Sequence, residues 1–208
     1  MKGIFISFEG IEGTGKSTQA RLLYDYLCKK GADVILTEEP GGTQIGAKIR
    51  EVLLSVEHTE MSHLTELLLY NASRAQHIQE VIMPALDRGA IVITDRFTDS
   101  TLAYQGYGRG LDLQLIDSID VIATGRLRPD ITLLLDTDVQ TGLKRNRGIN
   151  KTDRLELEDV AFHERVRNGY HMLAAKEPAR IKLIHASKNI EEMHREIIRI
   201  ISDLFLVS

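Results

Sequence analysis

The feature that most constrains the fold is a glycine-rich turn close to the start of the chain. Residues 10–17 read Gly-Ile-Glu-Gly-Thr-Gly-Lys-Ser and match the pattern G-x-x-x-x-G-K-[ST]. The turn follows an apolar run, Ile4–Phe8, and precedes a segment with helical periodicity, Gln19–Lys30. Because the pattern requires a strand before it and a helix after it, we predict a phosphate-binding loop at this position.

Glycines let such a loop curl so that successive backbone N–H groups face a phosphate chain, and the next helix adds the positive end of its dipole. Lys16 can then reach the β- and γ-phosphates of a nucleotide, and the Ser17 hydroxyl can coordinate Mg²⁺. We predict that ATP is bound by the loop and the residue after it: Gly10, Ile11, Glu12, Gly13, Thr14, Gly15, Lys16, Ser17 and Thr18.

Further apolar, β-branched runs alternate with helical segments along the chain. The runs are Asp33–Thr37, Ala90–Thr94, Ile131–Asp136 and Arg180–His185, and the helical segments are Leu64–Arg88 and Ile190–Phe205. Pro84 predicts a kink or break in the first of these helices. Alternation of this kind predicts an α/β fold, with a five-stranded parallel sheet and helices on both faces, in a single domain over residues 1–208.

Bulk properties exclude some classes of function. A net charge of -4 and a pI near 6.0 give no global basic surface for nucleic acid. The N-terminus lacks the features of a signal peptide, and no stretch reaches the length of a membrane span. The single cysteine, Cys28, excludes an internal disulfide. We expect a cytoplasmic protein that binds neither nucleic acid nor a membrane.

P-loop proteins include GTPases, ATPases and small-molecule kinases, and two absences narrow the choice. The sequence has no Asn-Lys-x-Asp run for reading guanine and no apolar strand that ends in Asp-Glu. Instead the third run ends in Asp95 and Arg96. Asp95 can hold Mg²⁺ through water, and the planar fork of Arg96 suits a second phosphate group. These residues predict a kinase for a small anionic acceptor.

Several ordered motifs make the chain resemble the thymidylate kinase family along nearly its whole length. They are Phe-Glu-Gly at 8–10, Glu-Glu-Pro-Gly-Gly-Thr at 38–43, Asp-Arg-Phe-Thr-Asp-Ser-Thr-Leu-Ala-Tyr-Gln-Gly at 95–106, Arg-Pro-Asp-Ile-Thr at 128–132, and residues 162–170. The resemblance implies a nucleoside-monophosphate kinase fold. It also implies transfer of the γ-phosphoryl group of ATP to dTMP with Mg²⁺, which gives dTDP and ADP for dTTP synthesis.

The resemblance also assigns an acceptor site. Arg50 and Arg96 would hold the acceptor phosphate, Arg74 and Thr101 would bond the thymine edge, and Tyr70 would stack on the base where the family more often has Phe. Tyr104 would crowd the 2′ position, Gln105 would close the pocket, and Glu12 and Glu39 would lie near the sugar or metal. The complete substrate-binding set is Glu12, Glu39, Pro40, Arg50, Tyr70, Arg74, Arg96, Ser100, Thr101, Tyr104 and Gln105.

A polar segment, Lys144–Asp159, predicts a lid over residues 143–157. One branch of the family has its catalytic arginine in the P-loop, at the position of Gly13 here, so this chain resembles the branch whose lid supplies it. Arg145, Arg147 and Arg154 are the candidates, and the sequence does not rank them. With Lys16 and Arg96 they form the predicted catalytic set, and Ser17 and Asp95 form the predicted metal site.

Two other functions are compatible with the P-loop. A kinase for a different nucleotide or for a deoxynucleoside is one, although an unphosphorylated acceptor would not need Arg50, Arg74 and Arg96 together. A regulatory nucleotide switch is the other, and it would phosphorylate no acceptor. The resemblance further implies a homodimer formed through helices, and the apolar faces of the segments 64–88 and 190–205 led us to expect spare surface there.

Overall fold

The computed structural model describes residues 3–147, 153–186 and 189–206. Within these residues, a parallel sheet has the strand order β2-β3-β1-β4-β5. The strands are β1 (Ile4–Glu9), β2 (Val34–Glu38), β3 (Ile91–Asp95), β4 (Ile131–Asp136) and β5 (Ile181–His185). The predicted fold class is therefore confirmed, and the predicted strand ends differ from the observed ones by one residue at most.

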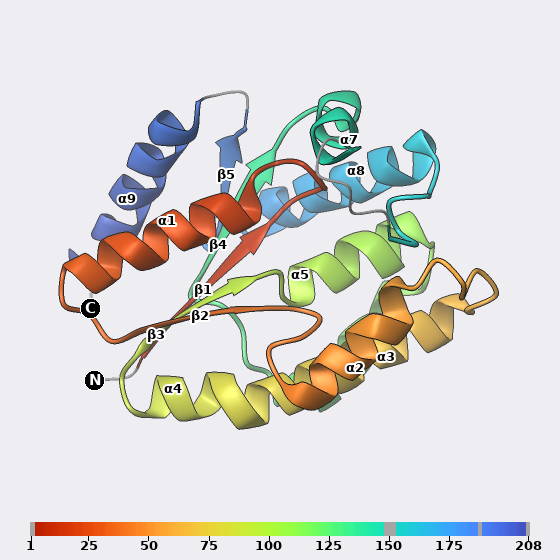
Figure 1. Cartoon of the computed structure of the whole chain (residues 1–208), viewed down its shortest axis with the longest axis horizontal. Coiled ribbons are helices and arrows are strands. Elements are labelled where there is room, and N and C mark those ends of the chain that lie inside the picture. Colours follow the sequence, from red (N-terminus) through yellow and green to blue (C-terminus); the bar gives the residue numbers. More distant parts are fainter. Residues whose placement is uncertain (1–2, 148–152, 187–188, 207–208) are drawn as a thin grey trace.

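Helices cover both faces of the sheet (Figure 1). On one face, α1 (Lys16–Lys29) and α9 (Ile190–Leu206) pack their apolar side chains against the strands in a shared core. The expectation of spare apolar surface on the terminal helix does not hold for Met193, Ile197 and Ile201, which are buried in this core, whereas Ile190 is 51% exposed. A helix needs only one apolar stripe to attach to a sheet, and α9 uses its stripe for that contact.

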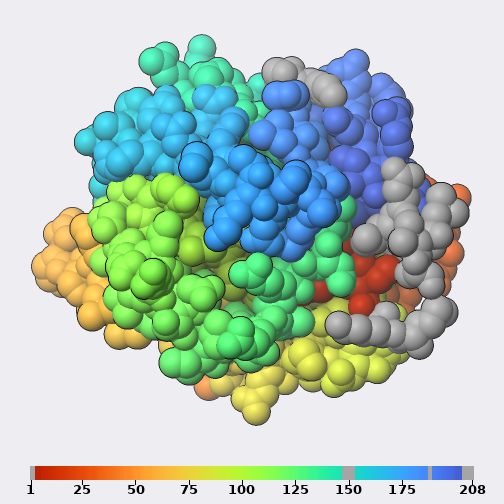
Figure 2. All heavy atoms as spheres, turned by 180° about the vertical axis from the view of Figure 1, so that it is seen from behind, coloured from red at the N-terminus to blue at the C-terminus, as the bar shows by residue number. Residues whose placement is uncertain are grey.

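The opposite face is covered by α8 (Val160–Lys176) and by the π-helical segments η1 (Ile78–Ile82) and η2 (Leu102–Gly108). Seen from behind, α8 lies beside the region that runs from η2 into α6 (Leu113–Thr124), and together they form a continuous surface (Figure 2). In the described part of the chain, no helix combines the length and the apolar character that crossing a bilayer requires.

The helix predicted around Pro84 changes its hydrogen-bond pattern just before the proline. It consists of α3 (His63–His77), η1 and α4 (Met83–Asp87), and the Met83 N–H bonds the Ile78 carbonyl five residues earlier. Proline has no N–H and crowds the preceding turn, so a wider π turn just before it keeps the helix continuous. Pro84 therefore lies in the first turn of α4, where its missing N–H costs little.

Several helices begin at side chains that accept backbone N–H bonds. Thr43 caps α2 (Gln44–Leu54), Ser62 caps α3, and Asp112 caps α6. The short α5 (Thr98–Thr101) leads into η2, and α7 (Val139–Arg147) follows β4. No helix was predicted from the sequence for the segments that form α2, α6, α7 and α8.

The strand order determines where a ligand can bind. β1 lies between β3 and β4, and Phe8 pairs in register with Asp95. Chain connections leave the carboxyl ends of these central strands in opposite directions, and the resulting crevice is the usual ligand site of such sheets. The P-loop after β1 and the Asp95-Arg96 pair after β3 therefore open onto the same crevice.

Candidate nucleotide-binding site

The turn between β1 and α1 has the backbone that its glycines predict. Gly10, Gly13 and Gly15 all have positive φ angles, of 136°, 71° and 91°, which are strained for other residues. Lys16 begins α1, and its buried ammonium donates to the Ile11 carbonyl at 2.8 Å. Burial, with the charge of Arg96 as a second cause, lowers the pKa of Lys16 to about 8. The loop thus holds one cation beside a row of backbone N–H groups.

Gly13 packs directly against the helix that enters the predicted lid. A Cβ atom added at residue 13 would collide with the carbonyl oxygen of Gly142 in α7, and one added at Gly142 would lie 2.6 Å from the Glu12 carbonyl oxygen. Two facing glycines therefore let the P-loop and α7 touch through their backbones. An arginine at position 13 has no room in this arrangement.

Ser17 and Asp95 meet as predicted for a metal site. The Ser17 hydroxyl donates to Asp95 at 2.5 Å, where the start of α1 faces the end of β3. Both groups offer oxygen atoms, which Mg²⁺ prefers, and they leave room for water and phosphate ligands. Among the described residues, no group of three or more His, Cys, Asp or Glu side chains is placed to hold a metal by itself. The pair fits a metal held jointly with a nucleotide.

Arg96 lies at the centre of the crevice and is held by several groups. Its φ of 75° is unusual for a residue with a side chain, and strain of this kind concentrates at functional sites. Nη2 donates to the Glu12 carboxylate at 2.9 Å, and Nη1 donates to the Gly10 carbonyl at 3.1 Å. The guanidinium also lies 5.0 Å from the ring centre of Tyr104. The fork is therefore fixed next to the P-loop.

A buried carboxylate, Glu9, supports this arrangement from behind. It accepts the Phe97 N–H at 2.7 Å, the Ser100 hydroxyl at 2.5 Å and the Tyr170 hydroxyl at 2.9 Å. Burial, followed by the charge of Asp99, raises the pKa of Glu9 to about 7. Ser100 and Tyr170 also bond Arg96, so Glu9 holds the partners of Arg96 in place. Glu9 belonged to a recognised motif, but its sequence neighbours gave no sign of this role.

Arg74 is buried rather than solvated, with 1% of its surface exposed. It donates to Glu39 at 2.8 Å, to Asp120 at 3.1 Å and to the Phe97 carbonyl at 3.2 Å. The other oxygen of Glu39 lies 2.9 Å from His77. Glu39 therefore has a role that the sequence did not predict, which is to hold Arg74.

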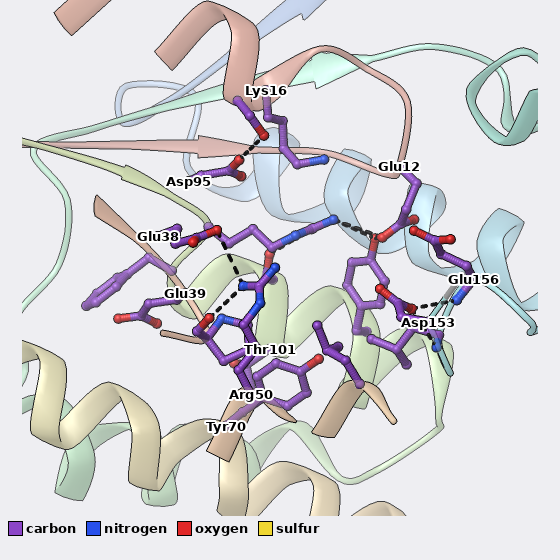
Figure 3. A pocket seen from close by; sticks show the side chains of 18 of the residues that line it. Glu12, Lys16, Glu38, Glu39, Arg50, Tyr70, Asp95, Thr101, Asp153 and Glu156 are labelled. Atoms are coloured by element: carbon purple, nitrogen blue, oxygen red, sulfur yellow. Dashed lines mark hydrogen bonds and ion pairs between the residues drawn. The ribbon is translucent and has the colours of Figure 1, made fainter. Parts of the chain in front are cut away.

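One cavity of about 410 Å³ is lined by Lys16, Ser17, Asp95, Arg96 and Arg74 together. Figure 3 shows Lys16 and Glu12 on its P-loop side and Thr101 and Tyr70 on the far side, with Asp153 and Glu156 along another wall. Thr101 is 1% exposed, and its hydroxyl has no hydrogen-bond partner among the described residues. A buried polar group without a partner indicates a position where a ligand can supply the missing bond.

The cavity contains every residue of the predicted acceptor set. It is lined by Glu12, Glu39, Pro40, Arg50, Tyr70, Arg74, Arg96, Ser100, Thr101, Tyr104 and Gln105. Of the predicted ATP-binding residues, Glu12, Gly13, Gly15, Lys16, Ser17 and Thr18 line it, whereas Gly10, Ile11 and Thr14 build the loop from behind. Asp95 also lines it.

The sequence missed other lining residues, which are Glu38, Leu54, Phe97, Asn146, Asp153, Leu155 and Glu156. A signal for part of this set was present, because the run Asp-Arg-Leu-Glu at 153–156 ends the polar segment. The sequence prediction used only Arg154 from this run, as a catalytic candidate. The three neighbours of that arginine face the cavity instead.

Neither of the two lid arginines whose side chains the structure describes lines the cavity. Arg145 is exposed on α7 and donates to the Ala186 carbonyl at 3.0 Å, and the side chain of Arg147 lies outside the described residues. Arg154 requires a correction, because its guanidinium is buried against Glu66 and does not line the cavity. A fixed buried ion pair is a poor source of a cation for a second ligand, so we no longer count Arg154 among the catalytic candidates.

Comparisons with known proteins agree with this geometry. The family model for thymidylate kinase matches residues 8–197. A thymidylate kinase from Halothermothrix orenii is 52% identical over 200 residues, covering 95% of each chain, and one from Geotalea daltonii is 50% identical over 197 residues, covering 91% of this chain and 92% of the relative.

A solved structure leads to the same conclusion. The crystal structure of thymidylate kinase from Ehrlichia chaffeensis superposes with a TM-score of 0.80 at 37% identity, over 97% of this chain and 99% of that one. The shared fold, the complete acceptor set in one cavity and the matched length leave a single assignment. The chain belongs to the thymidylate kinase family.

Proposed function

We propose that the chain is an ATP:dTMP phosphotransferase, which moves the γ-phosphoryl group of ATP to dTMP and releases dTDP and ADP in dTTP synthesis. Membership of the thymidylate kinase family supports the reaction. The observation that carries the proposal is a single cavity that holds the P-loop cation Lys16 at one end and the unpartnered Thr101 hydroxyl beside Arg74 at the other. Such a cavity lets an acceptor nucleotide lie with its base near Thr101 and its phosphate directed at the P-loop.

At the donor end, the backbone N–H groups of residues 10–17 bind the polyphosphate of ATP and Lys16 neutralises its terminal oxygens. The Ser17 hydroxyl and the Asp95 carboxylate would hold Mg²⁺. When bound, Mg²⁺ offsets negative charge that builds up on the transferring group. Thr18 follows at the start of α1 and completes the donor set.

At the acceptor end, Arg96 and Arg50 bind the phosphate of dTMP, while Arg74 and Thr101 bond the edge of thymine. Arg50 already donates to the Pro40 carbonyl at 2.6 Å, which turns its fork toward the cavity. These contacts place a phosphate oxygen of dTMP in line with the γ-phosphorus of ATP. That oxygen forms the new bond as the bond to the β–γ bridging oxygen breaks, so no covalent enzyme intermediate is needed.

The remaining acceptor residues select the nucleotide. Tyr70 stacks on thymine, Tyr104 occupies the space that a 2′-hydroxyl would need, and Gln105 closes the pocket beside the base. Glu12 bonds both Arg96 and Tyr104, at 2.9 and 2.7 Å, so a single carboxylate fixes the phosphate-binding and sugar-excluding groups together. Deoxyribose is thereby preferred to ribose.

A lid arginine supplies the last positive charge during transfer. Arg145 and Arg147 are the candidates, because both belong to α7, which touches the P-loop at Gly13. Positioned cations provide most of the transition-state stabilisation in phosphoryl transfer. Lys16 is the single cationic side chain of the P-loop, residues 10–17, all of which the structure describes. The lid over residues 143–157 also keeps water from the γ-phosphoryl group.

The assembly and compartment follow the family expectation. A homodimer forms through α3, α4 and α6, where Leu68, Met83 and Ile122 are exposed and the last is 84% exposed. Met83 and Ile122 both line a shallow hollow on this surface, so the two exposed apolar side chains lie near each other. Cys28, the single cysteine of the chain, is exposed and free, in keeping with the reducing cytoplasm.

ADP release with a panel of acceptors tests the function. We expect turnover with dTMP to exceed that with dUMP, dCMP, dAMP, dGMP, TMP with a ribose sugar, and thymidine. Thymidine separates a monophosphate kinase from a nucleoside kinase. Faster turnover with any of the other acceptors would overturn the assignment of the substrate, and no turnover with all of them would favour a regulatory switch.

A further inference from the structure

A buried carboxylate on α3 connects two walls of the cavity that are far apart in the sequence. Glu66 has no exposed surface, and one of its oxygens accepts Gln105 Nε2 at 2.8 Å and Arg109 Nε at 3.2 Å. Its other oxygen bonds Arg109 Nη2 at 3.1 Å and Arg154 Nη2 at 2.5 Å. Burial by itself would raise the pKa of Glu66, but the donors of Arg109 and Gln105 outweigh it and lower the pKa. Glu66 is therefore ionised and fully bonded.

Two of the three partners of Glu66 control parts of the cavity wall. Gln105 itself lines the cavity. Arg154 does not, but its neighbours Asp153 and Leu155 do. The Asp153 carboxylate accepts the N–H groups of Leu155 and Glu156 at 2.9 and 3.0 Å, which makes residues 153–156 one tight turn. A displacement of Arg154 would therefore move a turn that lines the cavity.

Arg154 depends on Glu66 for its position. In the described residues, its other hydrogen bonds to oxygen go to backbone carbonyls at the end of α2. The side-chain Nε donates to the Leu53 carbonyl at 3.2 Å, and the backbone N–H donates to the Leu54 carbonyl at 3.2 Å. Among the described side chains, Glu66 is the only carboxylate that pairs with it. A buried guanidinium without its counter-ion is strongly disfavoured, so loss of Glu66 would displace Arg154.

We propose that Glu66 is a positioning residue for the acceptor site, which holds the Gln105 amide and the 153–156 turn in one arrangement around the bound nucleotide. This inference rests on the proposed function, because it takes dTMP as the ligand of that wall. Glu66 touches no reacting atom. It acts through Gln105 on one side and through Arg154 on the other, so its loss weakens acceptor binding and leaves the donor end intact.

The test compares E66Q with R154M and a matched control, E158Q. Glu158 also pairs with Arg109, at 2.5 Å, but it bonds neither Gln105 nor Arg154 and does not line the cavity. We expect E66Q to raise KM for dTMP about tenfold with kcat and KM for ATP changed less than about threefold, the pattern of lost uniform binding. E158Q should match the wild type. An unchanged KM for dTMP in folded E66Q contradicts the proposal.

The relay through Arg154 needs a second readout. Hydrogen exchange of the Leu155 and Glu156 amides should slow when dTMP binds the wild type and E158Q, and should slow much less in E66Q and R154M. R154M should raise KM for dTMP much less in the E66Q background than in the wild type, because both substitutions remove the same Arg154–Glu66 ion pair. Additive effects in the double mutant, or full dTMP protection in R154M, would show that Glu66 serves only the fold.

These measurements separate the two proposals. If calorimetry detects no dTMP binding to the wild type, the proposed function fails. If the wild type binds dTMP and E66Q behaves identically, only the positioning role fails. Should E66Q not fold, R154M decides the matter, because Glu66 keeps Arg109 and Gln105 as partners in that variant.

Discussion

The two ends of the cavity are constructed differently. At the acceptor end, Arg74 is almost fully buried and has three fixed acceptors, and Arg96 is held by Glu12 and by partners that Glu9 orients. At the donor end, Lys16 makes a bond to one backbone carbonyl, and Arg145 is exposed on α7. Cations that are fixed by ion pairs favour the binding of one particular ligand. Less constrained cations can adjust to the negative charge that shifts between the phosphates during phosphoryl transfer.

This contrast predicts which changes affect selection and which affect turnover. Substitutions at the acceptor end should act mainly on the use of dTMP. Substitutions at the donor end should act mainly on the rate of transfer. The contrast is also testable by pH, because the acceptor cations are arginines and do not titrate, while Lys16 does.

The largest effect is expected in the lid. Arg145→Ala or Arg147→Ala should lower kcat about 10³-fold, with nucleotide affinities changed far less, because the charge is needed most in the transition state. Steady-state kinetics measures both quantities, and K144A on the same helix is the control. Unchanged turnover when Arg145 and Arg147 are both replaced by alanine would remove the lid from the mechanism.

A smaller effect is expected at Arg74. Arg74→Lys keeps the charge near Glu39 and Asp120 but loses the planar fork, so kcat/KM for dTMP should fall about 100-fold. KM for ATP should stay the same. The control is R88K, which alters an exposed pair with Asp33 elsewhere on the surface. If R74K affected ATP and dTMP equally, the division of the cavity into two differently built ends would be wrong.

The smallest effect comes from the titration of Lys16, whose pKa of about 8 in the free protein arises mainly from burial. A lowered pKa means that the ammonium loses its proton as pH rises through 8, so kcat/KM for ATP should fall about tenfold per pH unit above that value. The same ratio for dTMP, measured with ATP saturating, should stay nearly flat. A profile for ATP that bends only above pH 10 would show that Lys16 keeps its normal pKa.

Much of the donor end could be predicted from the sequence, because its chemistry is local. A curled loop needs glycines at fixed spacing, and Lys16 and Ser17 follow within the same segment. The strands were equally predictable, since a sheet covered on both faces needs short, almost continuous apolar runs. The π turn before Pro84 was predicted only as a disturbance, because sequence shows that the helix must adjust but not how.

The acceptor residues were known from ordered motifs, yet their partners were not. Glu39 and Asp120 converge on Arg74 from β2 and α6, segments that lie far from it in the chain. Burial raises the pKa of Asp120 to about 6 even though Arg74 opposes the shift. No local sequence pattern predicts such a contact, because it forms only when the helices have packed against the sheet.

The amino-acid sequence by itself determined the P-loop, the parallel sheet and the family, because these depend on short-range backbone chemistry and on motifs in a fixed order. Only the tertiary structure decided that Gly13 touches Gly142, that Arg154 is paired with Glu66, and that Asp153, Leu155 and Glu156 line the cavity. The physical reason is that the role of a buried charged side chain depends on the counter-ion beside it. Which counter-ion lies there depends on how distant segments pack.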